Sequence, residues 1–119
     1  MERISLAEKL SRIDAPWQPR IVAELNGQHV KLVKLEGDFV WHRHEAEDEL
    51  FLVVSGRLRL DFRDREVWLG QGEMIVVPRG VEHKPFAPTG CAVLLFEPAG
   101  TLNTGDVRDA RTVPDPERI

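Results

Sequence analysis

The sequence contains little of what several large classes of protein require. It has a single cysteine, Cys91, so it cannot form an internal disulfide, and we expect a reducing, cytoplasmic environment. No apolar run approaches the ~20 residues that cross a bilayer, and the N-terminus MERISLAEKL lacks the continuous apolar stretch of a signal peptide. The net charge of −4 provides no basic surface. We therefore expect neither nucleic acid nor a membrane among its partners.

Several common catalytic signatures are also missing. The chain shows no Ser–His–Asp arrangement and no dinucleotide fingerprint, and the GQG at 70–72 is too short for a phosphate-binding glycine loop. The 119 residues, 42% of them hydrophobic and 30% charged, are ordinary for one globular domain with one core. Any chemistry must therefore come from another kind of site.

Residues 1–27 are predicted to form a short helix and a connector. Ser5 followed by Glu8 has the spacing of a capping box, and Leu6, Leu10 and Ile13 form an apolar stripe. Prolines at 16 and 19 are expected to end the helix, because proline cannot continue it.

Residues 28–98 have a different pattern. Short β-branched and aliphatic runs alternate with turn signals about every eight to twelve residues, which is typical of an antiparallel sandwich or barrel. The tail at 99–119 is rich in Thr, Asp, Arg and Pro and is predicted to be largely irregular. The sequence thus predicts an all-β domain with one short helix.

Two of the predicted strands differ in how they should be covered. RLRLDF at 57–62 alternates, so one face should be buried and the other wet. ELFLVV at 49–54 is apolar on both faces, and Trp41 should add to its outer face. Because a closed barrel covers only the inner face, we expect the outer one to be covered by the N-terminal helix or by a second copy, giving a homodimer.

The stretch HRHEAEDELF at 42–51 contains the strongest chemical signal. In a strand, His42 and His44 point the same way and lie about 7 Å apart. If residues 45–48 are a hairpin loop, Glu49 lies opposite His44, and Phe51 lies opposite His42. Two imidazoles and a carboxylate would then share the interior face, where a divalent cation would satisfy the buried carboxylate.

Two motifs together closely resemble those of the cupin family. The first runs from Gly37 to Gly56 as His-x-His, four residues, Glu, six residues and Gly; the second runs from Gly72 to His83 as Gly, five residues, Pro-x-Gly, two residues and His. The resemblance implies a double-stranded β-helix, which is a small jelly-roll barrel. It makes His42, His44, Glu49 and His83 the ligands of one divalent transition metal (Fe, Mn, Ni, Cu or Zn). Ala87 stands where the family often has asparagine, so no further polar group comes from that position.

The predicted strands leave the function open between three hypotheses. The first is a metal-dependent oxygenase, isomerase or lyase that acts on a small oxygenated metabolite, and we favour it slightly. The second is a non-catalytic module that binds a small molecule beside the metal, and the third is a purely structural metal. The interior positions that strand parity assigns to the pocket are apolar: Phe51, Val53, Leu60, Phe62, Met74 and Val76.

Overall fold

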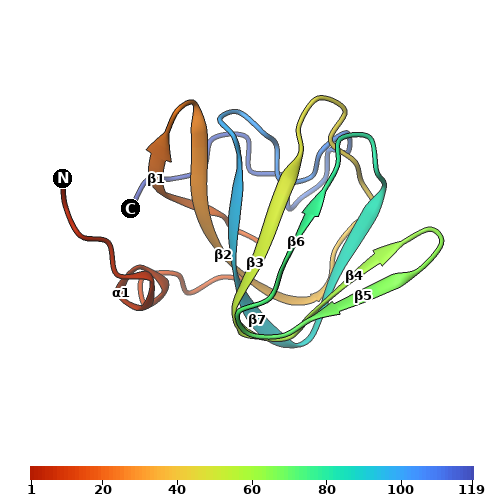
Figure 1. Cartoon of the computed structure of the whole chain (residues 1–119), viewed down its shortest axis with the longest axis horizontal. Coiled ribbons are helices and arrows are strands. Elements are labelled where there is room, and N and C mark those ends of the chain that lie inside the picture. The colour runs from red at the N-terminus through yellow and green to blue at the C-terminus, as the bar shows by residue number, and fades with distance from the viewer.

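The computed structural model describes all residues from 1 to 119 and shows an antiparallel barrel preceded by one short helix (Figure 1). No helix is long and apolar enough to span a membrane. The all-β barrel predicted from the sequence is confirmed. The elements, in chain order, are α1 (Leu6–Leu10), β1 (Arg20–Leu25), β2 (Gln28–Asp38), β3 (Glu49–Gly56), β4 (Leu58–Phe62), β5 (Glu66–Leu69), β6 (Met74–Val77) and β7 (His83–Pro98).

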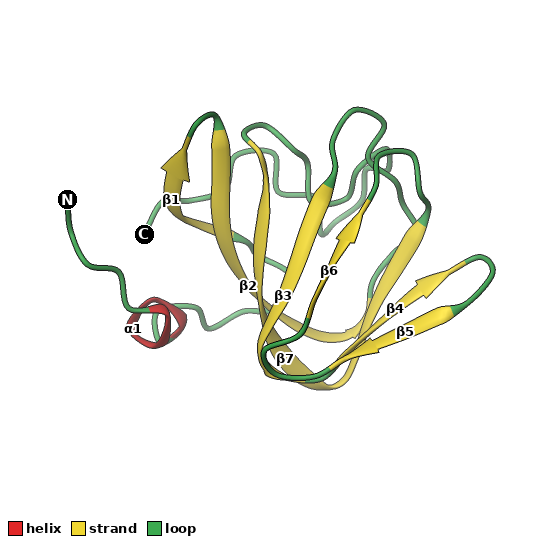
Figure 2. Ribbon diagram, in the orientation of Figure 1, coloured by secondary structure: helices red, strands yellow, loops and turns green.

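One long strand, β7, holds the barrel together. The sheet order is β1-β2-β7-β3-β6, and β4 pairs with both β5 and β7. The first part of β7 pairs with β4, and its second part runs between β2 and β3. All of these pairings are antiparallel, so Figure 2 shows one sheet that curves around a common interior.

The N-terminal segment differs from the expected helix and connector at one point. Residues Arg20–Leu25 form β1, which pairs with β2 through a tight turn at Asn26 and Gly27. Both turn residues have positive φ, 50° and 75°, as a type I′ hairpin requires. The helix begins as predicted, with the Ser5 side chain accepting a hydrogen bond from the Glu8 N–H.

The barrel interior is a continuous apolar core. On β4, Leu58 and Leu60 are buried, as the alternation of RLRLDF predicted. The core cluster comprises Val33, Leu35, Phe51, Val53, Leu58, Leu60, Leu69, Val77, Ala87, Cys91, Val93 and Leu95.

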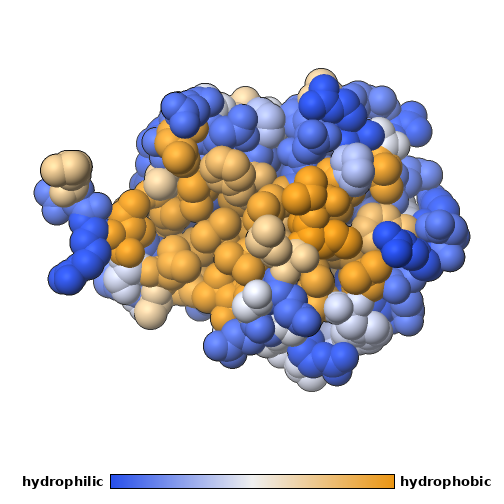
Figure 3. All heavy atoms as spheres, in the orientation of Figure 1, coloured by the Kyte–Doolittle hydropathy of each residue, from blue (hydrophilic) through white to orange (hydrophobic).

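The outer face of the same sheet is also apolar. Side chains from three neighbouring strands meet there in two rows, Phe96–Leu50–Val76 and Leu94–Leu52–Met74. Figure 3 shows a broad hydrophobic surface on the face that carries β2, β7, β3 and β6. Helix α1 packs against β2, where Leu32 is fully buried, but β6 carries no such cover.

Met74 and Val76 therefore do not line the interior, and this part of the pocket prediction is wrong. They are 59% and 52% exposed, whereas Val77 is buried. The register pairs Val77 with Glu49 and Ile75 with Phe51, which places the odd-numbered residues inside. Because EMIVV is apolar at successive positions, its parity cannot be read from hydrophobicity, and a one-residue shift inverts the faces.

The C-terminal tail is irregular, as predicted, and in Figure 1 it crosses the upper end of the barrel. It pairs with the segment that carries His42 and His44: the Arg43 N–H donates to Asp106, and the Asp106 N–H donates to the Arg43 carbonyl. At Gly105 the approach is so close that a Cβ atom would lie 2.3 Å from the Arg43 carbonyl oxygen. The tail is thus part of the wall around the site.

Candidate metal centre

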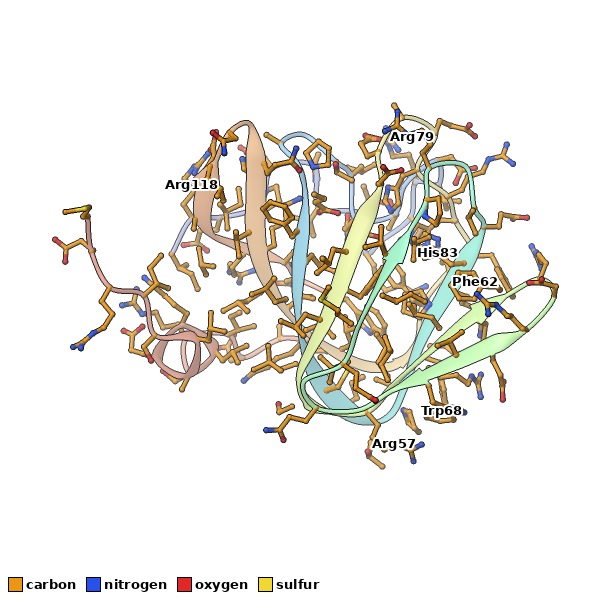
Figure 4. The ribbon with its side chains drawn as sticks, in the orientation of Figure 1. Arg57, Phe62, Trp68, Arg79, His83 and Arg118 are labelled. Atoms are coloured by element: carbon orange, nitrogen blue, oxygen red, sulfur yellow. The ribbon has the colours of Figure 1, made fainter.

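Four buried side chains converge inside the barrel. His42, His44, Glu49 and His83 each offer one ligand atom, and these atoms all lie within 4.8 Å of one another. His42 and His44 come from the loop between β2 and β3, Glu49 begins β3, and His83 begins β7. Figure 4 shows His83 inside the barrel. The structure therefore brings together the four residues that the sequence resemblance named.

The backbone arrangement that achieves this differs from the predicted hairpin. His42 pairs with His83, and each of the two N–H groups donates to the other residue's carbonyl, at 3.0 and 2.9 Å. Glu49 pairs with Val77, and Phe51 pairs with Ile75. The expected pairing of His44 with Glu49 and of His42 with Phe51 is therefore wrong. The residues meet across the barrel interior, because His42 pairs with β7 and Glu49 pairs with β6 and not with each other's segments.

Two of the imidazoles are held in the tautomer that a metal requires. Nδ1 of His42 lies 2.9 Å from the Val40 carbonyl, and Nδ1 of His83 lies 2.9 Å from the Val81 carbonyl. Because a carbonyl oxygen can only accept, each Nδ1 must carry the proton. Nε2 of each ring then carries the free lone pair, and the carbonyl fixes the orientation of the ring.

The polar atoms at the centre lack ordinary partners. Nε2 of His44, Nε2 of His83 and Oε1 of Glu49 are buried without an aligned hydrogen bond. The Glu49 oxygen lies 3.2 Å from His44 and 3.4 Å from His83, so the three atoms face one small space. Leaving such groups unpaired is costly. Three imidazoles and a carboxylate are a suitable donor set for a divalent transition metal, and the site fits such an ion.

The surroundings favour the protonation states that such an ion needs at His42 and Glu49, but not at His44. Burial, together with the neighbouring His83, lowers the pKa of His42 to about 4, so its ring is neutral at physiological pH. Burial works against ionisation of Glu49, but the nearby His44 and His83 hold the pKa of this carboxyl well below its usual range. Burial also lowers the pKa of His44, but the Glu49 carboxylate outweighs that effect, and the net pKa is raised.

A small apolar cavity opens beside His42 and Glu49. Its volume is about 30 Å³, which is room for about two water molecules. Besides these two ligands it is lined by Trp17, Pro19, Val33, Leu35, Phe39, Phe51, Pro85, Leu95 and Asn103. Any small molecule that reaches the cluster through this cavity must therefore be compact, or the cavity walls must move.

Only one of the six predicted pocket residues lines this cavity. Phe51 does so, whereas Val53 and Leu60 are packed in the core and Phe62 lies against the core on its outer rim, beside an open groove. Strand parity correctly placed Val53 and Leu60 inside the barrel. Parity could not reveal that Val53 and Leu60 pack within the core and do not line the cavity.

Besides Pro19, two residues outside the predicted barrel line the cavity, and the sequence analysis missed both. Trp17 stacks on Phe39 at a centroid distance of 4.5 Å and an interplanar angle of 8°. Its backbone has a positive φ of 63°, a strained conformation for a bulky residue, and its N–H donates to the Lys34 carbonyl. Asn103 comes from the C-terminal tail. No local sequence signal marks either residue as a cavity neighbour.

Comparisons with known proteins agree with this geometry. The cupin domain family model matches residues 28–97. A cupin-2 domain containing protein from Shewanella frigidimarina NCIMB 400 is 47% identical, with a TM-score of 0.79 over 80% of this chain and 93% of that one. Protein NMB1881 from Neisseria meningitidis is 38% identical, with a TM-score of 0.76 over 82% of this chain and 100% of that one.

Other relatives are less informative about function. The uncharacterized protein YdbB of Bacillus subtilis is 36% identical over 64 residues, which cover 53% of this chain and 57% of that protein. Hydroquinone 1,2-dioxygenase from Sphingomonas sp. TTNP3 has a TM-score of 0.67 at 17% identity, over 77% of this chain and 71% of that one, and shows a shared fold only. The family match covers more than half of the sequence and coincides with the barrel that holds the four ligands. The chain belongs to the cupin family.

Proposed function

We propose that this cupin binds one divalent transition metal through His42, His44, Glu49 and His83 and uses it as an enzyme on a small oxygenated metabolite. The observation that carries the proposal is the set of three buried, unpartnered atoms that face one space, on His44, His83 and Glu49. A core that evolved only for stability would have replaced them with apolar side chains, because buried polar groups without partners are destabilising.

The residues around the cluster suit catalysis of a restricted kind. Four protein ligands leave room for further ligands on an ion that accepts five or six, and a divalent metal there would act as a Lewis acid or activate oxygen. The apolar walls of the cavity would exclude bulk water and strengthen electrostatic interactions at the cluster. Trp17 and Phe39 would bound a flat or compact ligand on one side.

A specific observation favours a second candidate, a non-catalytic module that binds a small molecule. Asn103 is the only polar side chain in the cavity wall apart from the ligands and the indole of Trp17. Its amide is already engaged, because it donates to the Arg111 carbonyl and accepts from the Val113 N–H. No free acid or base therefore faces the cavity beyond the ligands, which disfavours demanding proton transfer.

We also propose that the outer face of β3, β6 and β7 associates with a second copy of the chain. Its seven positions, Leu50, Leu52, Val54, Met74, Val76, Leu94 and Phe96, include no charged side chain. Interfaces between identical subunits are the most apolar class, whereas transient partners leave more polar surfaces. A two-fold axis would let this uncharged face meet itself.

Two measurements test the functional proposal. Elemental analysis of protein purified without added metal should find about one divalent transition metal per chain. A screen of small diols, diketones and phenols should then be run twice with that metal present, for thermal shift and for product by mass spectrometry. Product from any compound supports the enzyme; several stabilising ligands without any product would establish the binding module instead. A metal-free protein that also fails to bind added metal would overturn both.

A further inference from the structure

A buried ion pair lies directly behind the candidate metal centre. Nζ of Lys31 donates to Oε1 of Glu97 at 2.8 Å and to the Thr101 carbonyl at 3.1 Å. The two side chains are 2% and 1% exposed, so this is no surface pair. Burying both charges costs several kcal/mol before their attraction is counted. An apolar pair of the same volume would avoid this desolvation cost, so the ion pair calls for an explanation.

The position of Glu97 supplies one. Leu50 pairs with Phe96 across β3 and β7, so Glu49 and Glu97 stand opposite each other one step further along the ladder. Side chains at directly opposed positions of an antiparallel pair are about 5 Å apart at Cβ. The second oxygen of Glu97, Oε2, is buried without a hydrogen-bond partner, and Glu49 is close enough to raise the pKa of Glu97.

We propose that Glu97, anchored by Lys31, is a positioning residue that holds the Glu49 carboxylate in place for the metal. This inference rests on the proposed metal site and deepens it. Glu49 is the first residue of β3 and directly follows the loop at residues 45–48. The strand therefore holds Glu49 in place from one side only. The Glu97 carboxyl accepts from Lys31 and stands opposite Glu49 in the ladder, and Lys31 is itself fixed by the Thr101 carbonyl.

The electrostatic arrangement agrees with this role. Two carboxylates in contact repel each other unless a proton or a cation lies between them or beside them. Burial and the charge of Glu49 raise the pKa of Glu97 well above its usual range, while that of Glu49 is held low. The ammonium group of Lys31 lies 2.8 Å from Glu97 and offsets negative charge on that carboxyl group.

The test is metal affinity in four variants of the full chain, with Co2+ as the probe. Glu97→Met removes the carboxyl group at similar volume and should weaken Co2+ binding about 10- to 100-fold, the usual loss for outer partners of a metal ligand. Glu97→Gln keeps an acceptor for Lys31 and a donor for Glu49, so it should bind close to wild type. Lys31→Met should weaken binding in the same direction as Glu97→Met. Lys84→Met is the control, because Lys84 follows His83 in the chain but its side chain makes an equally short bond, 2.8 Å, to Asp38, which is not one of the four clustered residues.

The visible absorption spectrum of bound Co2+ provides a readout that lost stability alone would not move. The spectrum should change in Glu97→Met and Lys31→Met, because the Glu49 ligand is displaced, and stay unchanged in Glu97→Gln and Lys84→Met. Wild-type affinity and spectrum in Glu97→Met would overturn the inference. If that variant does not fold, the same result in Lys31→Met would overturn it. An equal loss in Glu97→Gln would replace positioning by a charge effect. Failure of the wild-type protein to bind Co2+ is a different result, and it would overturn the metal site itself.

Discussion

Strand β3 departs from the usual arrangement of a protein on both of its faces. Its inner face carries Glu49 next to Phe51, and the carboxylate meets three histidines in the barrel interior. Its outer face carries Leu50, Leu52 and Val54, all only half buried. Polar groups thus lie where an apolar core would be more stable, and apolar groups lie where water would be expected. Both departures are costly for an isolated monomer, and each therefore indicates a binding role.

The two faces differ in the kind of partner that would relieve the cost. The inner face presents unpaired nitrogen and oxygen atoms at fixed positions, which a single cation would satisfy. The outer face presents apolar area, whose burial is favourable but not directional, and only another apolar surface would cover it. We therefore expect changes on one face to leave the partner of the other face unaffected.

The largest effect should come from removing a ligand on the inner side. His44→Ala should lower the affinity for metal at least 100-fold, because the ion loses one of four protein ligands and Glu49 loses its nearest contact, at 3.2 Å. Metal content after dialysis against micromolar metal should fall from about one equivalent to near zero. His29→Ala is the control, since His29 is also buried but lies outside the cluster. Unchanged stoichiometry in His44→Ala would show that the cluster is not the site.

The next effect separates the two faces by stability. Leu60→Ala leaves a void in a fully buried position and should cost about 2–5 kcal/mol of unfolding free energy. Met74→Ala, on the exposed outer row, should cost less than about 0.5 kcal/mol when measured at concentrations too low for association. Denaturant unfolding of both variants measures the difference. Equal losses would mean that the outer row is packed within a single chain.

The ligands could be predicted from sequence because each lies in a motif with rigid local geometry. Gly80, with a φ of 81°, ends the turn before His83, and the Val81 carbonyl then orients the ring. The β1 hairpin also had a readable signal in Asn26 and Gly27, which favour a two-residue turn between strands.

The remaining features depend on contacts between distant parts of the chain. The His42–His83 pairing joins residues 41 positions apart, and nothing local specifies it. Met74 and Val76 were misplaced because both faces of β6 are apolar, so only its register with β3 decides which side is inside. Trp17 and Asn103 reach the cavity from the two chain ends, and Lys31 and Glu97 meet across β2 and β7. Each of these features is decided by tertiary contacts between residues that are distant in the sequence.

Acidification should weaken the inner site in a graded way. The Glu49 carboxylate raises the pKa of His44, so metal must displace a proton from this ring at any pH below that pKa. The apparent affinity should therefore fall as pH drops through the raised pKa of His44, and the loss should approach tenfold per pH unit below it. His42 adds no loss in this range, because its pKa lies at about 4. Competition titrations with a metal-sensitive dye at pH 6, 7 and 8 measure the slope, and a flat profile would contradict it.

The smallest change, a factor of two in mass, should come from the outer face. Val76 is 52% exposed at the β6 end of the row Phe96–Leu50–Val76, so Val76→Lys places a charge where two copies would meet. Burying an unpaired ammonium in an apolar interface is unfavourable, and the variant should be monomeric where the wild type is a dimer. Leu25→Lys is the matched control, because Leu25 is 48% exposed but lies at the end of β1, away from these rows. Light scattering at low micromolar concentration gives the mass, and metal content should remain at the wild-type level in both variants. A wild-type protein that is already monomeric would remove the outer face from the comparison, leaving the buried cluster as the only part of β3 that requires a partner.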